Sequence, residues 1–289
     1  MRVVRVDEPM KDKKNVIFVA PGPGKSGADT TLRVLGCHPD IATPIALGPA
    51  LVGAVLRLLV HAPYDQDAWL PRRAAQAFAD VCRRLRLLGP FGERAAKTLE
   101  DSANVIFIDI PAYGHLAMPA PMPASTWRVL IRQIFLDAID TTERQYVALK
   151  LGPYCTGLVA TLLDSGDVFL HVVRHPVESV ITLTEPVIDG MRPLEAIDYV
   201  SLSLRHTQHV INMAASKNQT VKLEDFISSP DKVLAELKHI LRLSEHQEWQ
   251  AMSARCLPQG IQCEPRWDHP HICGYRQELA ALAQELRYQ

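Results

Sequence analysis

Two groups of residues in this chain carry side chains that suit the binding of anions. The first is a glycine- and proline-rich stretch at residues 21–27 (PGPGKSG), which contains Lys25 and Ser26. The second is Arg174, which follows an apolar run and precedes the hydroxyl of Thr182 by eight residues. Loop N–H groups, a lysine, an arginine fork and a hydroxyl are donors that hold phosphate and sulfate groups in proteins. The sequence therefore predicts two anion-binding sites.

The first site requires a strand, a loop and a helix in this order. Residues 15–20 (NVIFVA) are an apolar run typical of a strand, and an apolar helical pattern begins at Thr30. The loop between them is not a Walker A motif, because Val19 stands where that motif has its first glycine. Two interpretations of the loop stay open at this point: a cradle for phosphate or sulfate, and a rigid turn without a ligand.

The second site lies at the end of another strand. Residues 168–173 are apolar and Arg174 follows them directly, so Thr182 falls within the helix expected at residues 177–183. A guanidinium fork and a hydroxyl placed in this way can hold one phosphate group. Ligands of open α/β sheets bind at the carboxyl ends of the strands. We therefore expect Arg174 and the Lys25 loop to face the same crevice and to bind a ligand with two separated phosphates.

The elements that position these residues alternate between strands and helices. Apolar runs predict strands at residues 15–20, 105–110, 146–149, 168–173 and 220–223. Helical patterns occur at residues 50–59, 68–88, 125–139, 154–163, 177–183, 194–215 and again from Ser229. Strands that are apolar at consecutive positions and separated by helices are typical of a parallel sheet covered on both faces. The sequence thus predicts the α/β class, with an open, mainly parallel sheet flanked by helices, as a single domain over residues 1–289.

Composition argues against several other classes of protein. With 289 residues, of which 47% are hydrophobic, the chain can bury a large core, and a net charge of −1 argues against a nucleic-acid partner. Six cysteines without a C-x-x-C pair predict reduced thiols. The charged N-terminus lacks the apolar core of a signal peptide, which predicts a cytoplasmic protein. The longest apolar run, residues 41–60, is interrupted by Pro44, Pro49 and Arg57, so it predicts a core helix or a lid and not a membrane span.

Four segments, taken together, resemble the sulfotransferases that use 3′-phosphoadenosine 5′-phosphosulfate (PAPS). IFVAPGPGKSGADTTL at residues 17–32 resembles the 5′-phosphosulfate loop of that family. VFLHVVRHPVESVITL at residues 168–183 resembles its 3′-phosphate segment, in which an arginine after a strand is followed eight residues later by a serine. ALKLGPY at residues 148–154 is similar to the strand end that precedes this segment, and residues 221–241 are similar to the stretch before a late helix.

The resemblance implies a P-loop sulfotransferase-like fold and the transfer of a sulfuryl group from PAPS to a hydroxyl or amine of a small molecule, such as a natural product, which leaves adenosine 3′,5′-bisphosphate. It implies that Lys25 also takes part in catalysis, beside the leaving oxygen. The implied cofactor-binding residues are Gly24, Lys25, Ser26, Gly27, Thr30, Thr31, Arg174, Thr182 and Arg266. The chain departs from the family pattern at two places: Ala28 and Asp29 read as an insertion in the loop, and His175 replaces the usual aspartate.

Sulfuryl transfer also requires a group that removes a proton from the acceptor. His115 is the candidate base, because it lies in a proline-rich loop at residues 111–123 that follows a predicted strand, and His61 and Asp109 are reserves. The sequence contains no Asp/Glu cluster that would indicate a metal, so we expect no metal cofactor. The choice among these bases stays open.

Two other functions stay open at this level. A P-loop kinase or nucleotide triphosphatase would need a Walker B carboxylate with magnesium, and VIFID at residues 105–109 is the one stretch that suits it. A non-catalytic nucleotide-binding protein could use the same fold. The expected partner is a small-molecule acceptor, because the segments expected to line its pocket, residues 50–59 and 111–123, are not basic. Whether the apolar helices hide a homodimer surface also stays open.

Overall fold

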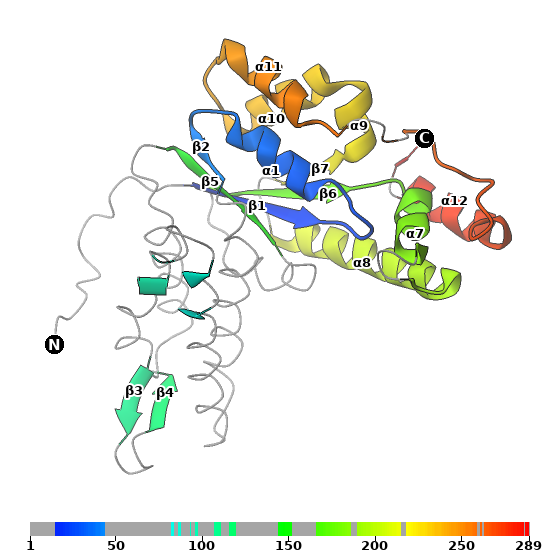
Figure 1. The fold of residues 1–289 in the computed structure, drawn as a ribbon, viewed down its shortest axis with the longest axis horizontal. Helices are drawn as coiled ribbons and strands as arrows, with labels where there is room; N and C mark the ends of the chain where they lie inside the picture. The colour runs from blue at the N-terminus through cyan, green and yellow to red at the C-terminus, as the bar shows by residue number, and fades with distance from the viewer. Residues whose placement is uncertain are drawn as a thin grey trace.

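The computed structural model describes the parts of the chain that form its main sheet and the helices around it (Figure 1). The described residues are 15–43, 82–83, 86–87, 93, 96–97, 107–110, 116–119, 144–151, 166–185, 190–214, 218–258, 261, 263–285 and 287–288.

The main sheet has five strands, and every pair of neighbours is parallel. The order is β2-β5-β1-β6-β7, with β1 in the centre. The strands are β1 (Asn15–Pro21), β2 (Ile41–Ala42), β5 (Tyr146–Lys150), β6 (Val168–Val173) and β7 (Asn218–Lys222). All six residues of β6 are buried, as expected for a parallel strand that is covered on both faces. The predicted fold class, an open parallel sheet flanked by helices, is confirmed by this topology.

Helices cover both faces of the sheet. In Figure 1, α1, α9, α10 and α11 lie on one side of the sheet, and α7, α8 and α12 lie on the other. Their bounds are α1 (Ala28–Gly36), α7 (Pro176–Thr184), α8 (Pro193–Ala214), α9 (Leu223–Ser228), α10 (Pro230–Leu241), α11 (Gln247–Cys256) and α12 (Arg276–Glu285), the last preceded by the 3₁₀ turn η2 (Cys273–Tyr275). The helices predicted at residues 177–183 and 194–215 and from Ser229 are therefore confirmed.

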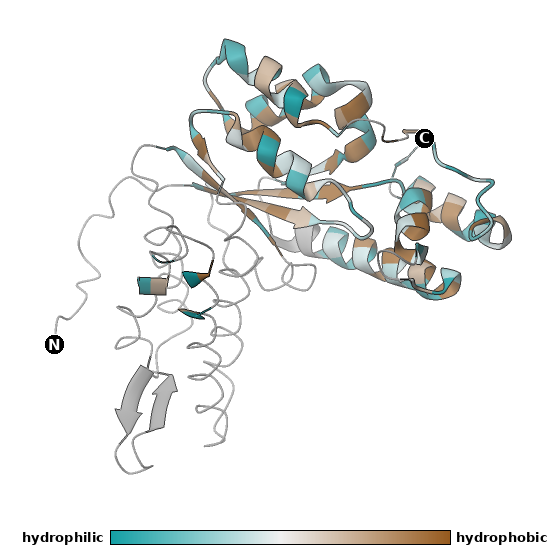
Figure 2. Cartoon of the chain, viewed as in Figure 1, coloured by the Kyte–Doolittle hydropathy of each residue, from teal (hydrophilic) through white to brown (hydrophobic). Residues whose placement is uncertain are grey.

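Two apolar cores hold these layers together, and β6 contributes to both because its side chains alternate across the sheet. Leu170 and Val172 pack in the core shared with α1 and α10, whereas Val173 packs in the core shared with α7, α8 and α12. Figure 2 shows the hydrophobic residues along the strands and on the helix faces that meet them. Each fully buried leucine or valine contributes about 1.5–3 kcal/mol, so the strand that carries Arg174 is held firmly.

The register of the two central strands determines where the site forms. β1 and β6 pair so that Pro21 lies beside Val172, and both strands therefore end at the same edge of the sheet. The loop after β1 and the arginine after β6 consequently emerge next to each other. This is the arrangement expected from the sequence for Lys25 and Arg174.

The strand predicted within residues 105–110 is confirmed, but it does not belong to the main sheet. β3 (Phe107–Ile110) pairs antiparallel with β4 (Leu116–Pro119) in a separate sheet of two strands. A short connection permits antiparallel pairing, whereas a parallel neighbour needs a long crossover. The proline-rich stretch at residues 111–123, expected to be a loop, accordingly contains β4.

Smaller differences concern where elements begin and end. Residues 41–42, expected to start a core helix or lid, form the edge strand β2. The strand expected at residues 220–223 begins earlier, and Leu223 already belongs to α9. The helices expected at residues 50–59, 125–139 and 154–163, and most of residues 68–88, lie outside the described residues. Among the helices that the structure describes, none has both the length and the apolar character needed to cross a membrane.

Candidate anion-binding site

The loop after β1 is pressed against its neighbours at three glycines. The N–H of Gly22 donates to the carbonyl of Val172 at 2.7 Å, which fixes the start of the loop to β6. Gly24 has a φ of +67°, and a Cβ added there would lie 2.5 Å from the carbonyl oxygen of Ser179 in α7. Gly27 has a φ of +94°, and a Cβ there would lie 2.6 Å from the side chain of Leu223. The loop therefore lies between β6 and α7 on one side and α9 on the other, and it follows this path because glycine tolerates positive φ.

Lys25 and Ser26 have environments that suit a ligand. Lys25 is exposed and has a φ of +54°, which is rare for a lysine. Strained backbone of this kind costs about 1–3 kcal/mol and clusters at ligand sites. Ser26 is only 3% exposed, and its hydroxyl has no hydrogen-bond partner among the residues that the structure places. The loop thus combines an exposed cation with a buried hydroxyl that lacks a partner among the described residues.

The helix that follows the loop directs its positive end toward it. Gly27 is the N-cap of α1 and provides no side-chain cap, so the N–H groups of the first turn have no acceptor within the helix. Thr31 is fully buried, and its hydroxyl donates to the carbonyl of Gly27 at 3.2 Å. Thr30 is half-buried in the same turn. The hydroxyl of Thr31 is therefore committed to the helix, whereas the backbone of this turn can bind an anion.

Ala28 and Asp29, which read from the sequence as an insertion relative to the family pattern, directly follow the loop. They are the first two residues of α1. The ammonium group of Lys150, at the end of β5, lies 2.8 Å from both carboxylate oxygens of Asp29. The negative charge next to the loop is therefore paired with a lysine from the neighbouring strand.

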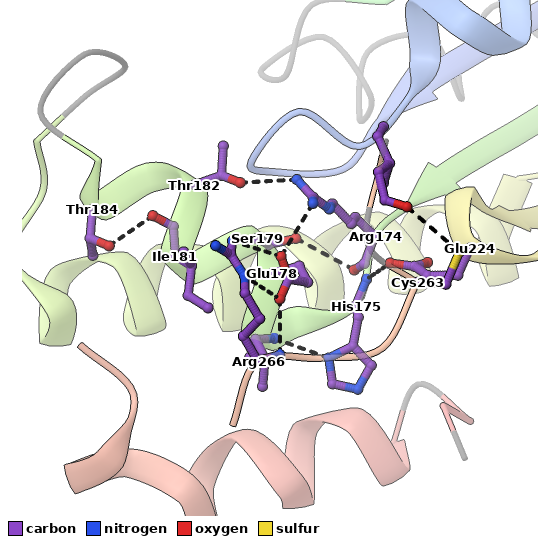
Figure 3. Close-up of polar contacts among 12 residues, drawn as sticks. Arg174, His175, Glu178, Ser179, Ile181, Thr182, Thr184, Glu224, Cys263 and Arg266 are labelled. Carbon is purple, nitrogen blue, oxygen red and sulfur yellow. Dashed lines mark hydrogen bonds and ion pairs between the residues drawn. The ribbon is translucent and has the colours of Figure 1, made fainter. Parts of the chain in front are cut away.

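The second group of residues lies around α7 (Figure 3). Arg174 follows β6, and its Nη1 donates to the Oγ1 of Thr182 at 3.0 Å. Its Nη2 donates to the Oε2 of Glu178 at 3.2 Å. The Nε of Arg174 is buried and has no hydrogen-bond partner among the described residues. Arg174 and Thr182, predicted from their spacing to act together, are thus in direct contact.

Arg266 joins this group from a distant part of the sequence. Its backbone N–H and its Nε donate to the Oε1 of Glu178 at 3.0 and 3.1 Å, and its Nη2 donates to Oε2 at 2.9 Å. Glu178 has no exposed surface. Burial alone would raise the pKa of this carboxyl group, but the hydrogen bonds from Arg266 and the charges of Arg266 and Arg174 outweigh burial and lower it. Glu178 is therefore ionised at neutral pH.

His175 caps α7, where the family pattern has an aspartate. Its Nδ1 accepts a hydrogen bond from the N–H of Val177 at 3.2 Å, as an aspartate at an N-cap would. Its own N–H donates to the Oε1 of Glu224 at 2.8 Å, and its ring packs edge-on against Trp267 and Tyr288. Burial lowers the pKa of His175 to about 4, so the ring is neutral at pH 7. The substitution keeps the cap and removes its charge.

Most of the predicted cofactor residues come together in space. The loop at Gly24 touches α7 at Ser179, and Ser179 lies between Glu178 and Thr182 in the sequence. Figure 3 shows Arg174 with Thr182 on one side and Glu178 on the other. The structure therefore places the loop, Arg174, Thr182 and Arg266 around the same helix.

The predicted base is not located. His115 and His61 lie outside the described residues, and Asp109 belongs to β3 in the separate sheet of two strands. Within the described parts of the chain, no three or more His, Cys, Asp or Glu residues are grouped to hold a metal ion. The catalytic role of His115 accordingly stays a prediction.

Glu178 and Glu224 were not identified from the sequence. The spacing of four residues between Arg174 and Glu178, on a predicted helix, is a signal for an ion pair that could have identified Glu178. Glu224 contacts the backbone of His175 across a gap of 49 residues. Such a contact between distant segments has no counterpart in the local pattern.

No protein-family model and no curated protein matches this chain. Sulfotransferase STF9 from Mycobacterium avium has a similar structure, with 12% identity and a TM-score of 0.48, over 95% of this chain and 76% of that one. The sulfotransferase domain from the curacin biosynthetic pathway has 14% identity and a TM-score of 0.49, over 96% and 99% of the two chains. The sulfotransferase domain from the Synechococcus PCC 7002 olefin synthase has 18% identity and a TM-score of 0.45, over 96% and 98%.

Proposed function

We propose that this chain is a sulfotransferase that binds PAPS and transfers its sulfuryl group to a hydroxyl or amine of a small molecule, such as a natural product. The observation that carries the proposal is the meeting of two anion-binding groups around α7. One is the Lys25 loop at the start of α1, and the other is Arg174 with Thr182 and Arg266. A nucleotide with phosphate groups at both ends of its ribose presents two anions to match them.

The residues present fit such a ligand. The hydroxyl of Ser26 and the Nε of Arg174 are buried donors that lack a partner in the described part of the chain. A buried donor that is left unsatisfied costs about 1–3 kcal/mol, so oxygens of a ligand that accept from these atoms would stabilise the complex. The helix N-terminus and the exposed ammonium group of Lys25 add positive potential at the loop. The acidic side chain in the first turn of α1 is Asp29, and its charge is paired with Lys150.

In this proposal each group has a separate task. The backbone N–H groups at the start of α1, together with Ser26, would hold the 5′ end of the nucleotide, and Arg174 with Thr182 would hold the 3′-phosphate. The bound cofactor supplies an activated sulfuryl group that is transferred in line to the acceptor. Lys25 would stabilise the negative charge that develops on the leaving oxygen, a role worth about 10²–10³ in rate where one such donor has been removed in other enzymes. His115 stays the candidate for removal of the acceptor proton.

The position of Asp109 argues against the alternative of a kinase or nucleotide triphosphatase, because Asp109 is the carboxylate of the Walker B candidate at residues 105–109. This alternative requires Asp109 at the end of a strand in the main parallel sheet, beside the phosphate loop. β3, which contains Asp109, pairs with β4 in the separate antiparallel sheet.

The proposal is tested by nucleotide binding. Thermal melting of the wild type is measured with adenosine 3′,5′-bisphosphate and, separately, with ADP and magnesium. A ligand that binds the native state alone raises the melting temperature by mass action, so we expect stabilisation by the 3′,5′-bisphosphate that persists with a chelator. Arg174→Ala should reduce this stabilisation. Arg192→Ala is the matched control, because the exposed side chain of Arg192 pairs with Glu195, which belongs to neither group of site residues.

The opposite result is equally clear. Stabilisation by ADP and magnesium alone would favour a kinase or nucleotide triphosphatase, and no stabilisation by either nucleotide would overturn the assignment of this site to PAPS. If the 3′,5′-bisphosphate binds, release of this product from PAPS in the presence of candidate hydroxyl and amine acceptors tests catalysis. Binding without any product release would favour a non-catalytic nucleotide-binding protein.

A further inference from the structure

Glu178 is the point where the two arginines of the site meet (Figure 3). Its carboxylate accepts four hydrogen bonds, two on each oxygen: Oε1 from the N and Nε of Arg266, and Oε2 from the Nη2 atoms of Arg266 and Arg174. Without this carboxylate, two guanidinium groups this close would repel each other. Glu178 thus holds two like charges together while leaving the group with a net positive charge.

The bonds to Glu178 leave donors free on both arginines. A guanidinium has five N–H donors, and Arg174 uses one for Glu178 and one for Thr182. Arg266 uses its Nε and one N–H of Nη2 for Glu178, and its Nη1 takes no part in these bonds. The side chain of Arg174 is 12% exposed and that of Arg266 is 36% exposed, so both can reach a ligand from solvent.

A competing interpretation is that Glu178 occupies the place of the anion and must leave before a ligand binds. Its position argues against this. The residue has no exposed surface and lies in α7, a helix in which every residue is buried. Removal of an ionised carboxylate from four donors in such a place would leave buried charge without a partner, which is strongly unfavourable. Glu178 therefore belongs to the fixed framework of the site.

We propose that Glu178 is a positioning residue that orients Arg174 and Arg266 as a preformed pair of forks for a terminal, doubly charged phosphate. This proposal rests on the proposed function, in which that phosphate is the 3′-phosphate of the nucleotide. A terminal phosphate offers three oxygens to the two forks, whereas a phosphate bridged on both sides offers fewer. Prior orientation lowers the entropy lost by two long side chains when the ligand binds. Glu178 accordingly sets the preference for a nucleotide with a free 3′-phosphate.

The test compares two nucleotides that differ in this phosphate alone. Calorimetric dissociation constants are measured for adenosine 3′,5′-bisphosphate and for 5′-AMP, with the wild-type protein and Glu178→Gln. Glutamine keeps the size of the side chain and removes its charge. We expect affinity for the bisphosphate to fall about ten- to hundredfold and affinity for 5′-AMP to change little. Glu195→Gln, which removes an exposed partner of Arg192, is the matched control and should change neither constant.

The ratio of the two constants separates positioning from a merely structural role. If Glu178→Gln weakens both nucleotides equally, or tightens the bisphosphate, positioning of the arginines is refuted. If the wild type itself binds the two nucleotides equally, the assignment of the 3′-phosphate site fails, and the role of Glu178 fails with it. Should Glu178→Gln not fold, as judged by circular dichroism, Glu178→Asp takes its place. Aspartate keeps the charge with a shorter reach, so an intermediate ratio supports positioning and an unchanged ratio refutes it.

Discussion

Substitution of Gly24 by alanine is expected to destabilise the protein and to weaken nucleotide binding at the same time. The position has a φ of +67°, and an added Cβ would lie 2.5 Å from the carbonyl oxygen and 2.7 Å from the Cα of Ser179. An alanine in the left-handed region costs about 1–2 kcal/mol. The obstructing atoms belong to the backbone of α7, so no rotation of a side chain can relieve the contact.

The expected loss of stability follows from these two effects together. Forcing a methyl group into a packed region costs about 1–3 kcal/mol, so we expect Gly24→Ala to lose about 2–5 kcal/mol in free energy of unfolding. For a chain of 289 residues the melting temperature should fall by about 3–8 °C. Because Lys25 is the next residue, the displaced loop should also bind adenosine 3′,5′-bisphosphate more weakly.

The assay is urea unfolding followed by circular dichroism, combined with nucleotide titration. Gly274→Ala is the matched control, because an added Cβ at Gly274 meets no atom within 4 Å. We expect that control to stay within about 0.5 kcal/mol of the wild type. A Gly24→Ala protein as stable as Gly274→Ala would refute the packing of the loop on α7, and with it the shared location of the two anion-binding groups.

Two further predictions concern two buried histidines and a pair of half-buried cysteines. Burial lowers the pKa of His171 to about 3 and that of His175 to about 4, from 6.5, so the unfolded chain binds more protons than the folded chain below pH 6.5. The free energy of unfolding should therefore fall as the pH falls from 6.5 toward 4, by at most about 1.4 kcal/mol per pH unit for each histidine. Urea unfolding should show that this free energy depends less on pH in His171→Phe than in the wild type. An unchanged dependence on pH would contradict the burial of the His171 ring. The Sγ atoms of Cys37 and Cys256 lie 3.5 Å apart, so oxidised glutathione should convert the two thiols to a disulfide while it is reduced to two molecules of glutathione. Because burial raises the pKa of Cys37 to about 11, this reaction should be slow at pH 7 and faster at pH 9. The cross-linked peptide is detected by mass spectrometry. Its absence from the oxidised wild type, or its presence in Cys256→Ser, would contradict the prediction.

The parts of the site that could be predicted from the sequence are those encoded locally. A glycine-rich loop between an apolar run and a helix predicts an anion cradle, because glycine at positive φ and the helix N-terminus are both features of adjacent residues. The spacing between Arg174 and Thr182 also predicts their contact, since one helix determines it. The parallel topology follows from the alternation of strands and helices. These inferences need no knowledge of how distant segments pack.

The remaining features depend on packing that the local pattern does not contain. The sequence of residues 107–110 (FIDI) suits a strand whether it pairs in the main sheet or with β4, so the sequence could not show which pairing forms. Asp29 reads from the sequence as part of an insertion in the loop, and the contact with Lys150 of β5 shows that its charge is paired. Three of the four hydrogen bonds that the Glu178 carboxylate accepts come from Arg266, which is 88 residues away in the sequence. Each of these contacts joins elements through the folded core.

α7 is the element through which stability and the proposed nucleotide binding are linked in this protein. Its nine residues are all buried, and it begins at the neutral cap His175 directly after Arg174. Its backbone at Ser179 supports the loop, and its side chains Glu178 and Thr182 hold Arg174. A helix packed in this way cannot move one of these groups without moving the others. Substitutions in the core that shift α7, even where they touch no polar residue of the site, should therefore weaken binding at both anion-binding groups together, whereas loss of a single donor such as Arg174 should weaken only one.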